Sequence, residues 1–73
     1  APATADRLDG AALAALVGHV PGSQSQYLRG DELCRIDKGH SVCGAIFAAP
    51  PGLGVDFVFL APTEIRFFSA PPK

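Results

Sequence analysis

Residues 33–43 have the sequence LCRIDKGHSVC and are the most diagnostic segment of the chain. Residues 33–36 alternate, residues 37–40 have the composition of a turn, and residues 41–48 return, which predicts a β-hairpin closed by a tight turn. If the loop holds two residues, Cys34 lies opposite Cys43 as a non-hydrogen-bonded pair. Such a pair brings its Cα atoms to about 4.5 Å, within the range that a disulfide tolerates.

Two other arrangements compete with this hairpin. A three-residue loop with Gly39 in the left-handed conformation would shift the register by one residue and separate the cysteines. Cys34, His40 and Cys43, with or without His19, could instead bind a metal, although their spacing matches no common zinc pattern. The opposed placement of the two cysteines favours a Cys34–Cys43 disulfide over a metal site or buried free thiols. We therefore expect neither a metal nor a cofactor.

A short helix is predicted ahead of the hairpin. Asp9 suits the N-cap position, the run 10–17 is rich in Ala, and Gly18 is the residue type that commonly follows a helix. Leu13 and Leu16 fall on one apolar stripe. Because so short a helix does not persist alone in water, it must pack on the rest of the chain.

The remaining sequence is β-like. Strands are predicted at 33–36, 41–48, 55–60 and 64–69, with a less distinct edge strand at 24–28. Clusters of Pro and Gly at 50–54 and 61–63 mark the turns, and Leu53 is an exposed apolar tip. The predicted fold is α+β, with one short N-terminal helix packed on a three- to four-stranded antiparallel meander and one hairpin disulfide.

Length and composition limit the possible classes of protein. The chain has 73 residues and a formal net charge of −1, with 48% hydrophobic and 18% charged residues. This predicts a single domain over 1–73, frayed at 1–5 and 70–73. The near-neutral charge argues against a nucleic-acid partner, and no apolar run approaches the roughly 18 residues of a membrane span.

The composition also indicates a compartment. A disulfide in so small a chain is typical of oxidising environments outside the cytoplasm. The sequence contains no Met and begins with Ala1-Pro2-Ala3. Either trimming of an initiator Met or cleavage of a signal peptide leaves such an N-terminus. Together with the predicted disulfide, this favours a periplasmic or secreted protein whose signal peptide has been removed.

The segment 55–60, VDFVFL, suggests where a partner would bind. Alternation places Phe57 and Phe59 on one face of the strand and Val58 and Leu60 on the other. One helix can cover only one face of a small sheet, so an apolar face is left over. The N-terminal lead or the loop 22–30 could fold over this face instead. We predict a partner-binding surface formed by Val58, Leu60 and Phe68, with Arg66 in its polar rim.

No catalytic constellation is recognisable in the sequence. Candidate Ser, His and Asp residues lie in different loops, and Asp31 and Glu32 are adjacent on an extended segment, where their side chains face opposite sides. Arg29-Gly30-Asp31 matches a short adhesion motif, but three residues often match by chance, and we interpret them as a polar turn into the strand. We expect a protein that is not an enzyme.

The expected function is therefore that of a small extracytoplasmic protein-binding module: an inhibitor, an immunity-type protein or an accessory subunit of a larger exported protein. A second possibility is a structural or self-assembling protein whose surplus sheet face forms a homodimer. A third is a small metal- or redox-active protein that uses Cys34 and Cys43. The partner is expected to be another protein or a second copy of the chain.

Overall fold

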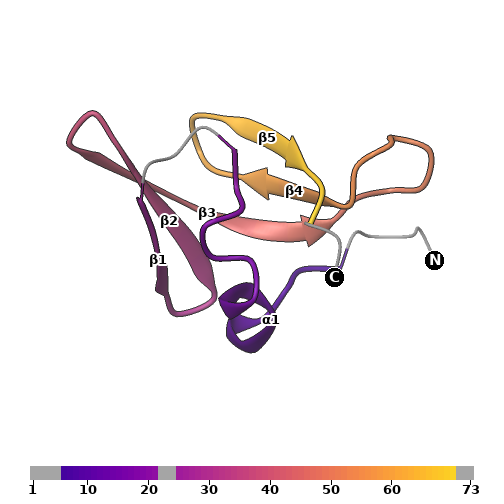
Figure 1. Ribbon diagram of the computed structural model, residues 1–73, viewed down its shortest axis with the longest axis horizontal. Coiled ribbons are helices and arrows are strands. Elements are labelled where there is room, and N and C mark those ends of the chain that lie inside the picture. The colour runs from indigo at the N-terminus through magenta and orange to yellow at the C-terminus, as the bar shows by residue number, and fades with distance from the viewer. Residues whose placement is uncertain (1–5, 22–24, 71–73) are drawn as a thin grey trace.

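An antiparallel sheet with one short helix packed against it makes up the computed structural model, which describes residues 6–21 and 25–70 (Figure 1). The helix is α1 (Gly10–Ala14). The strands are β1 (Ser25–Arg29), β2 (Glu32–Asp37), β3 (His40–Ala48), β4 (Phe57–Leu60) and β5 (Ile65–Phe68). They follow the order β1-β2-β3-β4-β5 in one sheet.

The expected three- to four-stranded meander is thus a five-stranded one. The additional strand is β1, which pairs with all of β2 from Ser25↔Ile36 to Arg29↔Glu32. Its polar sequence, SQYLR, carries little β signal of its own. The predicted frayed segments 1–5 and 71–73 lie outside the described residues, whereas Ala70 packs partly buried against the core.

The β2–β3 hairpin has the predicted two-residue loop. Lys38 and Gly39 both have positive φ, 52° and 81°, as a type I′ turn requires. Asp37 pairs with His40, so Cys34 falls opposite Cys43. The two residues form a disulfide with their Cα atoms 4.0 Å apart, which confirms the predicted bond.

The helix begins where predicted and ends earlier. The Asp9 carboxylate accepts the Ala12 N–H at 2.9 Å, as an N-cap does. After Ala14 the chain continues in tight turns, in which the Leu16 N–H donates to the Leu13 carbonyl three residues back. Leu13 and Leu16 are both buried, as the apolar stripe predicts.

The core lies on one side of the sheet, which we call the covered face. Its buried apolar residues come from the helical segment and from four of the strands or their ends, and they are Leu13, Leu16, Val20, Leu33, Ile46, Phe59, Ala61 and Phe68. The Gln26 side chain accepts the Gly18 N–H at 2.5 Å and donates to the Val20 carbonyl at 2.7 Å. These bonds hold the segment after α1 against β1.

Gly44 lies at the bend where β4 leaves β3. An added Cβ on Gly44 would lie 2.5 Å from the Leu60 carbonyl oxygen and 2.9 Å from the Ala61 Cα. The backbone at the end of β4 therefore passes over the position where any other residue would have a side chain. This close approach brings the connection before β5 back towards β2, where Glu64 forms an ion pair with Arg35.

Candidate functional site

The side of the sheet opposite the helix carries an apolar surface. Cross-strand partners point to the same side of a sheet, so each row of paired residues shares a face. One row runs Phe47, Val58 and Phe67 across β3, β4 and β5, and the next runs Ala45, Leu60 and Ile65. We call the surface formed by these two rows the open face.

Three side chains of the open face are well exposed: Leu60 at 44%, Ile65 at 57% and Phe67 at 53% of their full area. Leu53, in the loop before β4, is exposed to the same extent as Phe67, and the two line a shallow apolar hollow with Val55. The apolar tip expected at Leu53 thus extends the open face. Contiguous exposed apolar surface of this kind marks contact sites in soluble proteins.

The open face contains two of the four predicted contact residues. Val58 and Leu60 lie on it, but Arg66 and Phe68 do not share their side of the sheet. Phe59 pairs with Arg66, and Phe57 pairs with Phe68, whose ring centroid lies 5.5 Å from that of Phe57. Phe68 is 4% exposed and belongs to the core. The expectation that these four residues share one face is therefore wrong.

The cause of this error is the register between β4 and β5. Leu60 pairs with Ile65, so the connection holds the four residues 61–64. That length places Val58 opposite Phe67 rather than on the side of Phe68. The alternation within each strand was predicted correctly. The register between β4 and β5, however, decides which alternate residues of one strand share a face with which residues of the other. Ile65 and Phe67, which sequence reasoning missed, take the places assigned to Arg66 and Phe68.

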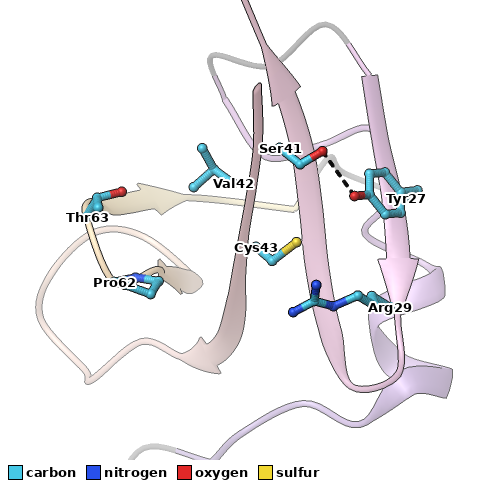
Figure 2. Close-up of a pocket in the computed structure, with 7 residues that line it drawn as sticks. All are labelled: Tyr27, Arg29, Ser41, Val42, Cys43, Pro62 and Thr63. Atoms are coloured by element: carbon cyan, nitrogen blue, oxygen red, sulfur yellow. Dashed lines mark hydrogen bonds between the residues drawn. The ribbon is translucent and has the colours of Figure 1, made fainter. Parts of the chain in front are cut away.

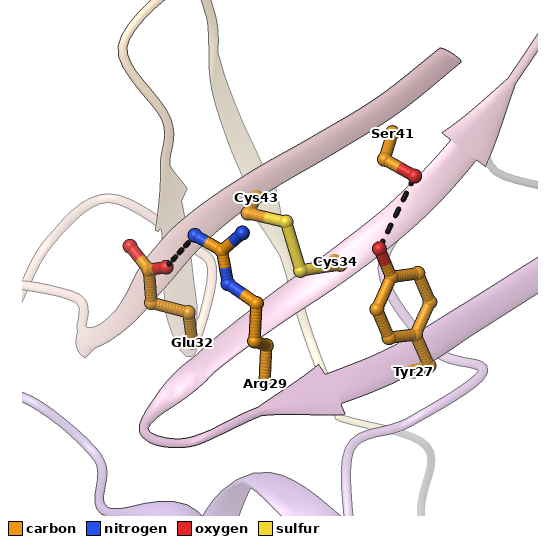
Figure 3. The surroundings of a disulfide bond; sticks show 6 residues. All are labelled: Tyr27, Arg29, Glu32, Cys34, Ser41 and Cys43. Atoms are coloured by element: carbon orange, nitrogen blue, oxygen red, sulfur yellow. Dashed lines mark hydrogen bonds and ion pairs between the residues drawn. A yellow bond between two sulfur atoms is a disulfide. The ribbon is translucent and has the colours of Figure 1, made fainter.

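A second, more polar groove lies beside β3, next to the disulfide. It is lined by residues of β1, of β3 and of the turn between β4 and β5: Tyr27, Arg29, Ser41, Val42, Cys43, Pro62 and Thr63 (Figure 2). The Tyr27 hydroxyl reaches over β2 to the Ser41 hydroxyl, 3.1 Å away. Figure 3 shows Tyr27 and Arg29 on the side of the sheet that carries the disulfide, where Cys34 is fully buried.

Two arginines share the carboxylate of Glu64. Arg35 is buried and pairs with Glu64 and, at 3.7 Å, with Asp37. The Arg66 Nε–H also donates to Glu64, at 2.6 Å. Hydrogen bonds from Arg66 and then from Arg35 hold the pKa of the Glu64 carboxyl below its ordinary value of 4.5, because they stabilise the charged form.

The adhesion-like tripeptide forms the β1–β2 turn, with Gly30 at φ 64°. The tripeptide therefore lies at the tip of the β1–β2 hairpin, which corrects the expectation of a turn that merely precedes a strand. Arg29 forms an ion pair with Glu32 at 3.0 Å, and Asp31 forms one with Arg7 at 3.0 Å. Both charges of the motif thus have partners within the chain.

The possible metal ligands named above, Cys34, His40 and Cys43 with or without His19, do not form a metal site. The sulfurs of Cys34 and Cys43 are bonded to each other, so neither is available as a thiolate. Within residues 6–21 and 25–70, no group of three or more His, Cys, Asp or Glu side chains has the arrangement of a metal site. Over the same residues, no helix is long and apolar enough to cross a membrane.

Comparison with known proteins gives no relative from which a role can be carried over. No protein-family model matches the chain. No curated protein matches it at the sequence level. No solved structure matches it either.

Proposed function

We propose that the chain is a small, non-enzymatic, extracytoplasmic protein-binding module that contacts a partner protein through the open face. The observation that supports this most directly is the exposure of Leu60, Ile65 and Phe67 on neighbouring strands. Aromatic and aliphatic side chains gathered at one place suit the dry centre of an interface, where a few residues supply most of the binding energy. An inhibitor, an immunity-type protein or an accessory subunit would each use such a surface.

The disulfide supports the compartment in this proposal. Structural disulfides persist in oxidising environments and are rare in the cytosol of most organisms. Cys34 is fully buried and Cys43 is partly buried, which favours a structural role over exchange with external thiols. The bond also stiffens the β2–β3 hairpin on which the rest of the sheet is built.

The test uses a photo-crosslinking amino acid, p-benzoylphenylalanine, in place of Phe67 in the full chain, produced in its native host. The same residue in place of Ala14 is the control, because Ala14 is exposed on α1, on the opposite side of the sheet from the open face. We expect light to join the chain to a second, different protein from position 67 and not from position 14.

Two other outcomes would overturn the proposal of a distinct partner. An adduct of twice the 7.5 kDa chain mass would identify a second copy as the occupant of the open face and favour the self-assembling alternative. No adduct from position 67, together with a monomer in sedimentation equilibrium, would show that the open face binds no protein.

A pair of substitutions checks that the contact depends on the apolar side chains. Ile65→Ser with Phe67→Ser should abolish the adduct formed from a crosslinker at position 60 while leaving the circular dichroism spectrum unchanged.

A further inference from the structure

Strand β3 is much longer than its neighbour β4. β3 runs from His40 to Ala48, and β4 pairs with residues 45–48 alone. After Leu60 the chain turns away over Gly44. Residues 40–44 pair with β2 along one edge of β3. Along the other edge, β4 is too short to reach them, so they have no neighbouring strand there.

The hydrogen bonds around β3 show which backbone groups point towards that edge. The Ile46 carbonyl accepts the Leu8 N–H, and the Ala48 N–H donates to the Asp6 carbonyl, both at 2.8 Å, on the edge away from β4. Successive residues of a strand point their N–H and C=O groups to opposite edges. The N–H and C=O groups of Ser41 and Cys43 therefore point to the edge that β4 leaves open.

Those groups have no backbone partner among the described residues. The backbone bonds of residues 6–21 and 25–70 that lie outside the strand ladders include none from Ser41 or Cys43. Unpaired N–H and C=O groups in a row are a template for another strand. The outer edges of β1 and β5 also carry unpaired groups, but the edge of β3 at Ser41–Cys43 lies at the bottom of a groove between side chains.

The polar groove described above lies along this edge. It touches Ser41 and Cys43 on one face of β3 and Val42 on the other, as a groove at the edge of a strand must. Pro62 and Thr63 form its far wall, and Tyr27 and Arg29 border it on the side of the disulfide (Figure 2). Its volume of about 370 Å³ lies at the small end of ligand sites and suits a few residues of extended chain.

Arg29 supplies the charge among the residues that line the groove. Its guanidinium forms an ion pair with the Glu32 carboxylate at 3.0 Å, and its side chain is 68% exposed. A guanidinium has five N–H donors, so one ion pair leaves donors for a second acceptor. An acidic side chain on a chain lying in the groove would be the complementary group.

We propose that the edge of β3 at Ser41–Cys43 binds an extended peptide segment of a partner protein as an additional strand, with an acidic side chain of the peptide facing Arg29. Main-chain hydrogen bonds to Ser41 and Cys43 would supply the affinity, as in other cases of strand addition. None of the residues that line the groove belongs to the open face, so the proposal does not rest on the function proposed above.

The test is selection from a phage-displayed library of random seven-residue linear peptides against the full, disulfide-bonded chain. Selected peptides should be rich in Asp or Glu. We expect the Ser41 and Cys43 amides to exchange fast in the free protein and more slowly with a peptide bound. The amides of Val42 and Gly44, which face β2, should be protected in both cases.

A pair of variants at one position isolates the backbone bond. Ser41→Pro removes the N–H that points into the groove, and proline is tolerated where that side of a strand is open. Ser41→Ala loses the hydroxyl and keeps the N–H. We expect Ser41→Pro to weaken peptide binding about tenfold or more, Ser41→Ala to change it little, and Ile65→Ser with Phe67→Ser to leave it unchanged.

Three results would overturn the proposal. The first is a selection that yields no binding peptide. The second is a set of peptides that slow amide exchange at neither Ser41 nor Cys43. The third is a peptide affinity that is equal for the Ser41→Pro and Ser41→Ala variants. The exchange measurement on the wild-type chain stands even if Ser41→Pro fails to fold. Loss of binding in Ile65→Ser with Phe67→Ser, with Ser41→Pro unaffected, would instead assign the peptides to the open face.

Discussion

Arg35 of β2 and Glu64, the residue before β5, form an ion pair between parts of the sheet that are not neighbours. Arg35 is 1% exposed, and Glu64 also accepts a hydrogen bond from Arg66. Burying a charge is costly unless an opposite charge accompanies it. The pair therefore ties the β4–β5 connection to the disulfide-bonded hairpin, 29 residues earlier in the chain.

Glu64→Gln is expected to lower the free energy of unfolding by about 3–5 kcal/mol, because it leaves the charge of buried Arg35 without its main partner. Urea unfolding at pH 7 measures the change. Glu32→Gln is the matched control: its partner Arg29 is 68% exposed, and such surface pairs contribute only about 0–1 kcal/mol. Equal losses in the two variants would show that Arg35 does not depend on Glu64.

The same pair predicts how stability varies with pH. The folded state lowers the pKa of Glu64 from 4.5, so the unfolded chain takes up this proton at a higher pH than the folded one does. The resulting stabilisation is fully present above the ordinary pKa and is lost as the pH falls through the lower pKa of the folded state. We expect the stability gap between wild type and Glu64→Gln to be constant near neutrality and to narrow below pH 4.5. A gap that stays constant down to pH 2 would contradict this.

The hairpin could be predicted from the sequence because all its determinants are local. The turn residues alone allow a two- or a three-residue loop, and the two cysteines favour the two-residue form because only that register places Cys34 opposite Cys43. The start of α1 was predictable for the same reason, since Asp9 caps the backbone only three residues away.

The environment of Arg35 was not predictable in this way. Alternation along β2 gives no sign that its guanidinium is buried, because the carboxylate that accompanies it comes from the far end of the chain. The open face was half predictable. Surplus apolar side chains were visible in 55–60, but their neighbours on β5 depend on a four-residue connection whose conformation the sequence does not specify.

Removing the disulfide tests how far the hairpin depends on it. In the chain-entropy model, a bond that closes a loop of this size stabilises by about 2–3 kcal/mol, and we expect that loss for Cys34→Ala with Cys43→Ala. Thermal unfolding measures it. The intact mass after alkylation without reductant should be unchanged in the wild type, and two readily alkylated thiols in the native protein would contradict the bond.

Gly44→Ala tests the bend that brings Glu64 to Arg35. The new Cβ would lie 2.5 Å from the Leu60 carbonyl oxygen, and the atoms in its way belong to the backbone and cannot rotate aside. We expect a loss of about 1–3 kcal/mol, as in other overpacked sites, as the end of β4 is pushed away from β3.

The pH profile separates this displacement from a general loss of stability. If the end of β4 moves, Glu64 moves with it, the ion pair to Arg35 weakens, and the acid-dependent part of the stability shrinks in Gly44→Ala. Gly39→Ala is the control. It costs about 1–2 kcal/mol through its left-handed backbone, φ 81°, but its Cβ would meet no atom within 4 Å. Gly39→Ala should therefore keep the full wild-type loss of stability between pH 5 and pH 2. If both glycine variants kept that loss, the close approach at Gly44 would not be what positions Glu64, and the ion pair would form independently of the bend.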